Sequence, residues 1–233
     1  NFLVFVENST SDITTALNIN ITTSTQFVVY FPTSSLAMTD AGTPQYFNIY
    51  REFIKNIPFI CPLTEHTYNV DKSKPDENYL KFLAFNPSNG LSPYYYHIDI
   101  SQSRIVFIDL VASTRSPRIL KEQIGYLTKV LFANSIKWLI LILNEKIYPL
   151  PERDNMDEIL DIINKAKPSL LIQYSKYPYR RGRLISDAIV SESFYVTLGY
   201  YSEELEDSNA EIISNKAGIL KVNTGENSVE VLY

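Results

Sequence analysis

Trp138-Leu139-Ile140-Leu141-Ile142-Leu143-Asn144 contains the longest apolar run in the chain, and it stops at a polar residue. A run of six apolar residues is too short for a typical helix and fits a strand that is buried on both faces. Similar short runs, rich in β-branched and aromatic residues, predict further buried strands. These are Phe2 to Val6, Phe27 to Phe31, Pro58 to Cys61 and Leu170 to Ile172.

Amphipathic segments separate these runs. Gln45 to Asn56, Ile119 to Asn134 and Asp154 to Lys165 each repeat apolar residues at helical spacing, so each predicts a helix with one packing face. Two other segments alternate like strands and contain a turn. Tyr94 to Leu110, bending at Ser101 to Ser103, and Gly218 to Tyr233, bending at 223–227, predict antiparallel hairpins. The pattern as a whole predicts an α/β, or layered α+β, domain.

The composition limits the fold and the partners. With 233 residues and 45% hydrophobic content, the chain can close one substantial core, so we expect one domain over residues 1–233. The 21 basic and 26 acidic residues give a formal charge of -5, which argues against binding to nucleic acid or to an anionic bilayer. No apolar run approaches the roughly 20 residues of a membrane span, so none is expected.

The compartment is left open. The single cysteine, Cys61, excludes an internal disulfide and a zinc site built from several cysteines. Asn8-Ser9-Thr10 and Asn20-Ile21-Thr22 match the glycosylation sequon, which favours an extracytoplasmic or secreted setting. The start at Asn1, directly before an apolar run, is compatible with a preceding segment that was removed or is not included.

Several stretches, taken in order, resemble the calcineurin-like metallophosphoesterase family and especially its purple-acid-phosphatase-like branch. The resemblance rests on stretches that run from the first strand, through the Tyr94 to Asp109 hairpin, to the closing hairpin. They are Phe2-Leu3-Val4-Phe5, Gln45-Tyr46-Phe47, Ile57-Pro58-Phe59-Ile60, Tyr94-Tyr95-Tyr96-His97-Ile98-Asp99, Ile105-Val106-Phe107-Ile108-Asp109, Gln123-Ile124-Gly125-Tyr126-Leu127 and Lys137-Trp138-Leu139-Ile140. The resemblance implies a β-sandwich flanked by helices, with two metals held by loops at the carboxyl ends of strands.

The metal ligands of that family are mostly absent from the corresponding positions. Where the family has Asp-x-His after its first strand, this chain has Glu7-Asn8-Ser9, and Pro32-Thr33 replaces the family's Gly-Asp. Thr64-Glu65-His66-Thr67 keeps only the histidine of the third motif. Asn144, followed by Glu145, replaces the next histidine, and Gln173-Tyr174-Ser175-Lys176 replaces the closing Gly-His-x-His.

This loss predicts that no metal cofactor is bound. A two-metal centre needs a bridging carboxylate and several imidazoles, whereas the whole chain has two histidines. One of them, His97, falls in a predicted strand, where a structural role is expected. Lys176 would oppose a cation at a former ligand position. The alternative is a divalent metal such as Mn, Fe or Zn, held by Glu7, Glu65, His66 and Glu145 in a non-standard site.

Two other groups of residues contain side chains that could have a chemical role. Cys61 and His66 are near in sequence, but Cys61 sits in an apolar run and is expected to be buried rather than nucleophilic. Tyr177-Pro178-Tyr179-Arg180-Arg181-Gly182-Arg183 combines aromatic and arginine residues that could bind an anion, although pairing with the chain's own carboxylates is the commoner outcome.

Three functions therefore follow from the sequence. The first is a non-catalytic phosphoesterase-like domain acting as a structural or binding module, with a protein or a glycan as the partner. The second is a phosphoric ester hydrolase with a non-standard metal site. The third is a cleft that binds a phosphorylated or anionic ligand through Lys176 and Arg180 without reacting.

Overall fold

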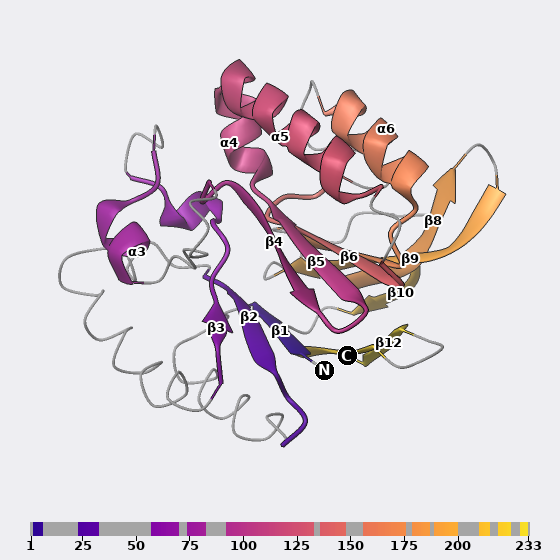
Figure 1. Ribbon diagram of the computed structural model, residues 1–233. Helices are drawn as coiled ribbons and strands as arrows, with labels where there is room; N and C mark the ends of the chain where they lie inside the picture. Colours follow the sequence, from indigo (N-terminus) through magenta and orange to yellow (C-terminus); the bar gives the residue numbers. More distant parts are fainter. Residues whose placement is uncertain are drawn as a thin grey trace. The chain divides into compact units, whose positions relative to one another are not determined.

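The computed structural model describes residues 2–6, 23–32, 57–69, 74–82, 92–132, 136–147, 156–175, 179–186, 189–199, 210–214, 219–224 and 229–232. The chain divides into two compact units, Asn1–Pro93 with Ala217–Tyr233, and Tyr94–Lys216. We call these unit 1 and unit 2. Each unit has its own β-sheet (Figure 1). The expectation of one domain over residues 1–233 stays a prediction.

Unit 1 contains a five-stranded sheet with the order β12-β11-β1-β2-β3. Its strands are β1 (Phe2–Val6), β2 (Phe27–Phe31), β3 (Phe59–Ile60), β11 (Ile219–Thr224) and β12 (Val229–Leu232). β1, β2 and β3 run parallel, whereas β11 is antiparallel to β1 and β12 is antiparallel to β11. All five residues of β2 are buried, which explains why its sequence is continuously apolar.

A short helical segment follows β3 in unit 1. The 3₁₀ turn η2 (Glu65–Thr67) comes directly after Thr64, and helix α3 (Glu77–Phe82) comes next. The Tyr79 hydroxyl, from α3, donates to the carbonyl of Cys61. Cys61 is a buried free thiol, as expected from its apolar surroundings in the sequence.

Unit 2 contains a seven-stranded mixed sheet with the order β10-β8-β9-β7-β6-β5-β4. Its strands are β4 (Tyr95–Ile100), β5 (Ser103–Ile108), β6 (Trp138–Leu143), β7 (Leu170–Ser175), β8 (Tyr179–Ser186), β9 (Ile189–Gly199) and β10 (Ala210–Ser214). β5, β6, β7 and β9 run parallel, and β4, β8 and β10 are antiparallel to their neighbours. The β4–β5 turn uses Ser101 with φ 55°, the left-handed conformation that closes a tight bend.

Three helices of unit 2 lie over one face of this sheet: α4 (Leu110–Arg115), α5 (Pro117–Val130) and α6 (Asp157–Ala166) (Figure 1). Side chains cap the first two, because Asp109 accepts from the amide of Ala112 and Ser116 accepts from the amide of Ile119. Pro117 opens α5, where its missing N–H costs nothing. Lys167 ends α6 in the left-handed conformation.

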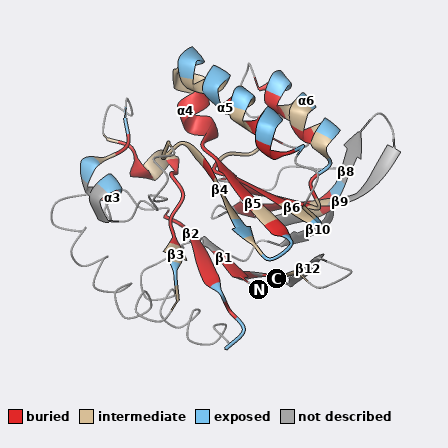
Figure 2. Ribbon diagram, viewed as in Figure 1, coloured by how far each residue is buried: buried red, intermediate tan, exposed pale blue. Residues whose placement is uncertain are grey.

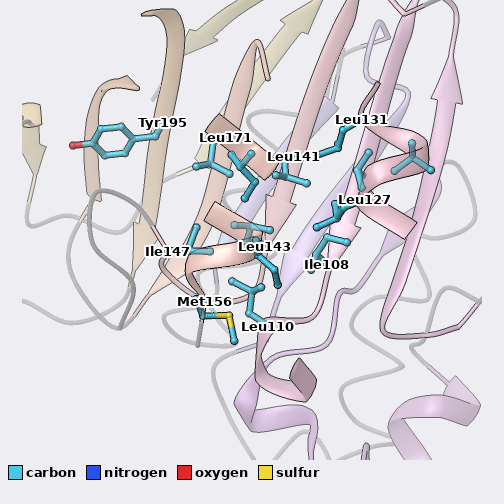
Figure 3. Close-up of a cluster of buried hydrophobic side chains, with 14 residues drawn as sticks. Ile108, Leu110, Leu127, Leu131, Leu141, Leu143, Ile147, Met156, Leu171 and Tyr195 are labelled. Atoms are coloured by element: carbon cyan, nitrogen blue, oxygen red, sulfur yellow. The ribbon is translucent and has the colours of Figure 1, made fainter. Parts of the chain in front are cut away.

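The core of unit 2 forms between these helices and the helix-facing side of the strands. Figure 2 shows the buried strands beneath helices whose outer faces are exposed. Figure 3 shows Leu127 and Leu131 pointing toward Leu141 and Ile108, with Met156 and Ile147 closing the other end of the cluster. Burying each such side chain contributes about 1.5–3 kcal/mol, so this cluster stabilises the helix-on-sheet layer.

The structure confirms most of the predicted elements. All five predicted strands are present, and the one expected at Leu170 to Ile172 continues to Ser175. Both hairpins form, while the helix expected at Asp154 begins at Asp157. Gln45 to Asn56, both sequons and the bend at 225–227 lie outside the described residues. In the part of the chain that is described, we find no helix with the length and apolarity of a membrane span.

Candidate functional site

In unit 1, a buried threonine links the segments that follow β2 and β3. Thr64 has no solvent exposure, and its hydroxyl donates to the carbonyl of Pro32 at 3.0 Å. Its backbone amide donates to the hydroxyl of Thr67 at 2.9 Å, and that hydroxyl donates back to the Thr64 carbonyl at 2.8 Å. These contacts lie at the carboxyl ends of the parallel strands β2 and β3. They form a structural clamp that is made of neutral groups.

His66 and Glu65 lie together on η2. The Nε2 atom of His66 is 3.7 Å from the nearer carboxylate oxygen of Glu65, and their side chains are 23% and 36% exposed. The two residues thus form a partly open pair that could exchange a proton or contribute to a cation site. The backbone amide of His66 donates to the hydroxyl of Thr64 at 3.3 Å, so the clamp positions this pair.

In unit 2, the ends of β5 and β6 are joined through Asp109 and Asn144. Ile108 and Leu143 are opposite each other in the parallel ladder, so the residues that follow them are neighbours. The Asn144 amide nitrogen donates to the Asp109 carboxylate at 2.5 Å, and the Asn144 amide oxygen accepts from the amide of Leu110 at 2.7 Å. Both side chains are almost fully buried. We call this arrangement the Asp109–Asn144 bridge.

Unit 2 has two further buried side-chain amides, those of Gln123 and Gln173. The Gln123 amide nitrogen donates to the carbonyl of Asp109 at 2.9 Å, which ties α5 to the end of β5. On β7, the Gln173 amide oxygen accepts from the amide of Ile147 at 3.0 Å, and its nitrogen donates to the hydroxyl of Thr197 at 2.8 Å. Each amide therefore has both its donor and its acceptor satisfied inside unit 2.

These residues do not fit a two-metal centre. Nowhere among the described residues do three or more His, Cys, Asp or Glu side chains group in a way that could hold a metal ion. The Asn144 oxygen, the atom that could bind a cation, already accepts a hydrogen bond from Leu110, and the nitrogen is a donor.

The predicted site residues fall into three groups. Glu7 and Lys176 lie outside the described residues. Glu65 and His66 are adjacent in unit 1, and Glu145 follows Asn144 in unit 2 as a half-buried side chain. The sequence reading did not identify Asp109, Gln123 or Thr197. Asp109 had a usable signal, since an aspartate between a buried strand and an apolar helical start is typical of an N-cap.

The arginines of the predicted anion-binding segment lie on a strand. Arg180, Arg181 and Arg183 all belong to β8, although the side chain of Arg180 is outside the described part. The guanidinium carbons of Arg181 and Arg183 lie 5.0 and 5.2 Å from the centre of the Phe194 ring on β9. Both distances are within the range of a cation–π interaction.

His97 connects the edge strand β4 to helix α5. Its Nδ1 atom is 2.7 Å from the Tyr126 hydroxyl, and its Nε2 atom is 3.9 Å from the carboxylate of Asp99, which Arg104 holds through two 2.7 Å hydrogen bonds. Burial lowers the pKa of His97, and the nearby Arg104 guanidinium lowers it further, against the opposing effect of Asp99. These contacts give His97 the structural role that was expected.

Comparisons with known proteins concern the fold. No protein-family model and no curated protein matches the sequence. Among solved structures, the chain is similar to the purple acid phosphatase PPD1 from yellow lupin (Lupinus luteus) seeds, with a TM-score of 0.66 and 12% identity over 95% of this chain and 48% of that one. It therefore spans about half of the length of that phosphatase chain.

A second similar structure matches nearly all of this chain and about four fifths of its own. It is GAP50, described as the anchor in the inner membrane complex of Plasmodium, with a TM-score of 0.67 and 12% identity over 99% of this chain and 82% of that one. Two sheets with flanking helices, together with the likeness to these two structures, confirm the predicted α/β fold class. The chain has the fold of the calcineurin-like metallophosphoesterases.

Proposed function

We propose that this chain is a non-catalytic phosphoesterase-like domain that acts as a structural or binding module. One observation carries the proposal. Asn144, at the position where the family resemblance places a metal-binding histidine, is buried and uses both ends of its amide to join Asp109 and Leu110. The side chain stabilises the fold in place of holding a cation.

A metal ion at this position would compete with existing hydrogen bonds for the same side-chain atoms. A metal at this position would need the Asn144 oxygen as a ligand, and a metal that displaced the hydrogen bond from Leu110 would leave that buried amide without an acceptor. An unsatisfied buried donor costs about 1–3 kcal/mol, and a neutral amide gives a weaker ligand than imidazole.

The binding role is supported by likeness alone. GAP50, whose fold this chain shares, is described as an anchor, which is a role in holding other components. We extend that role here and propose a protein partner, with a glycan as the alternative. The extracytoplasmic setting that the two sequons favour belongs to the same proposal.

The second candidate is a metal-dependent phosphoesterase with a non-standard site. The pair of Glu65 and His66 favours it, since both side chains are partly exposed and lie 3.7 Å apart. Glu7 and Glu145 would have to supply further ligands to Mn, Fe or Zn. Hydrolysis would then depend on His66 as the imidazole ligand of the site.

An assay of phosphate ester hydrolysis separates the two candidates. Purified protein is incubated with p-nitrophenyl phosphate and with Mn²⁺, Fe²⁺ or Zn²⁺ added in turn. A non-catalytic domain releases no more p-nitrophenol than the His66→Ala variant. The matched control is His97→Gln, because the chain has two histidines and His97 lies on β4. Turnover that His66→Ala abolishes and His97→Gln retains would refute the proposal.

A further inference from the structure

Two arginines and one aromatic ring form a compact group on the β8–β9 strand pair. Arg183 is directly opposite Phe194 in the antiparallel ladder, and Arg181 is opposite Val196. Because side chains alternate along a strand, Arg181 and Arg183 point to the same side of the sheet as Phe194. The ring therefore contacts both guanidinium groups, at 5.0 and 5.2 Å from its centre. We call these three residues the arginine–phenylalanine group.

Arg181 is incompletely satisfied by the residues that the structure describes. Its Nε atom is buried and has no hydrogen-bond partner among them. Leaving a charged donor buried without an acceptor is unfavourable, and contact with an aromatic ring offsets only part of that cost. Arg181 as a residue is half-buried and Arg183 is exposed, so a group from outside the chain can approach this pair of arginines.

The geometry selects the chemistry of that acceptor. Phe194 lies within cation–π distance of each guanidinium, so the two positive charges are held next to each other. A carboxylate has two oxygens and one charge and matches a single arginine fork. A phosphate monoester has three acceptor oxygens and carries about −1.5 to −2 charge at pH 7, so it can accept from both guanidinium groups at once.

We propose that Arg181 and Arg183, held by Phe194, bind the phosphate group of a ligand. This inference goes beyond the non-catalytic role proposed above, because it needs neither a metal nor hydrolysis. It also differs from a cleft formed by Lys176 and Arg180, since it uses the side of β8 that carries Arg181 and Arg183. The ligand could be free orthophosphate or a phosphorylated side chain, and both present the same group.

Thermal unfolding of the chain tests this site with defined probes. Tm is measured in sodium phosphate, in O-phosphoserine and in sodium acetate, each at about 10 mM and at equal ionic strength. With a Kd of about 1 mM, a bound phosphate raises the folding equilibrium constant about tenfold, which is about 3–6 °C in Tm for a chain of this size. Acetate should give a smaller shift. A larger response to phosphoserine indicates an esterified ligand, and a larger response to orthophosphate indicates the free ion.

Variants separate a binding role from a structural brace. Arg181→Gln and Arg183→Gln should each raise the Kd for phosphate at least about tenfold, which reduces the rise in Tm that phosphate causes. Both variants should still unfold cooperatively without phosphate. Arg118→Gln is the matched control, because this exposed arginine on α5 pairs with Glu122 at 2.9 Å. It should keep the full response. If Arg181→Gln does not fold, the phosphate-dependent change in Tm is compared between the wild-type chain, Arg183→Gln and Phe194→Leu.

Three results would overturn the inference. The first is no phosphate-dependent shift in the wild-type chain. The second is a shift that acetate reproduces at equal ionic strength, and the third is a shift that survives in both arginine variants.

Discussion

Replacing Asn144 with alanine removes both contacts of the Asp109–Asn144 bridge. The amide of Leu110, which is buried, loses its acceptor at 2.7 Å. The carboxylate of Asp109 loses a donor at 2.5 Å and keeps the amide of Ala112 at 3.0 Å. An orphaned buried N–H costs about 1–3 kcal/mol, and a lost hydrogen bond to a charged group costs about 1.5–3 kcal/mol. Because the two share a side chain and do not simply add, we expect a loss of about 3–5 kcal/mol in the free energy of unfolding.

Urea denaturation measures this loss with an intrinsic probe. Trp138 is the single tryptophan of the chain and lies on β6, the strand that Asn144 directly follows, so its fluorescence follows unfolding of unit 2. The m-value should stay unchanged while the midpoint falls. The control is Asn164→Ala on the half-buried side of α6, where a change within about 0.5 kcal/mol is expected.

The reasoning fails if Asn144→Ala costs less than about 1 kcal/mol, or no more than Asn164→Ala. Either result would mean that the bridge does not stabilise the fold. Asn144 would then be open to another role, including that of a ligand.

Three further predictions concern unit 2. Burial and Arg104 lower the pKa of His97 below its usual 6.5. The free energy of unfolding should therefore keep its full value above pH 6.5 and fall as the pH drops below 6.5. The His97→Gln variant should show a flatter pH dependence in urea titrations from pH 7.5 to 5.5. Arg104 lowers the pKa of Asp99, so the stability from this pair should be present above the usual pKa of 3.8 and be lost as the pH falls through the lower folded value. Since Asp99 is 45% exposed, Asp99→Asn should cost only about 0.5–1 kcal/mol at pH 7 by chemical denaturation. Gly125→Ala on the exposed side of α5, where an added Cβ meets open space, should raise Tm through a gain of about 0.5–1 kcal/mol, as a thermal scan would show.

The sequence predicted the elements whose surroundings are uniform. β2 and β6 are apolar throughout because both of their faces are covered, and the run of residues alone revealed them. Helix α5 was recognised from its apolar stripe, although it starts at Pro117 and its regular part ends at Val130, earlier than the predicted Asn134. Its ends depend on Ser116 as a cap and on tertiary packing, which periodicity does not report.

β8 was missed because its sequence does not look like a strand. Tyr179-Arg180-Arg181-Gly182-Arg183 combines charge with a glycine, and both features are rare in strand interiors. Pairing with β9 on one side and β10 on the other satisfies its backbone, and Phe194 covers two of its arginines. These stabilising contacts come from residues far along the chain, so no local pattern could predict them.

The candidate site shows the same limit. The motif comparison found that Asn144 stands where a histidine would be expected, but not what Asn144 does instead. Its partner Asp109 is 35 residues away and becomes a neighbour only because β5 and β6 are adjacent and in register. The absence of ligand types can be predicted from a sequence, whereas the hydrogen bonds that replace them require the topology.

Elemental analysis of the purified chain shows whether the strand ends hold metal ions. The protein is exposed to Mn²⁺, Fe²⁺ and Zn²⁺ and then exchanged into metal-free buffer. The bound metal per chain is measured by elemental mass spectrometry. If the strand ends carry hydrogen-bonded clamps in place of a metal centre, each chain should retain well under about 0.1 metal ion. Retention of about two ions per chain, as a two-metal phosphoesterase requires, would contradict the account.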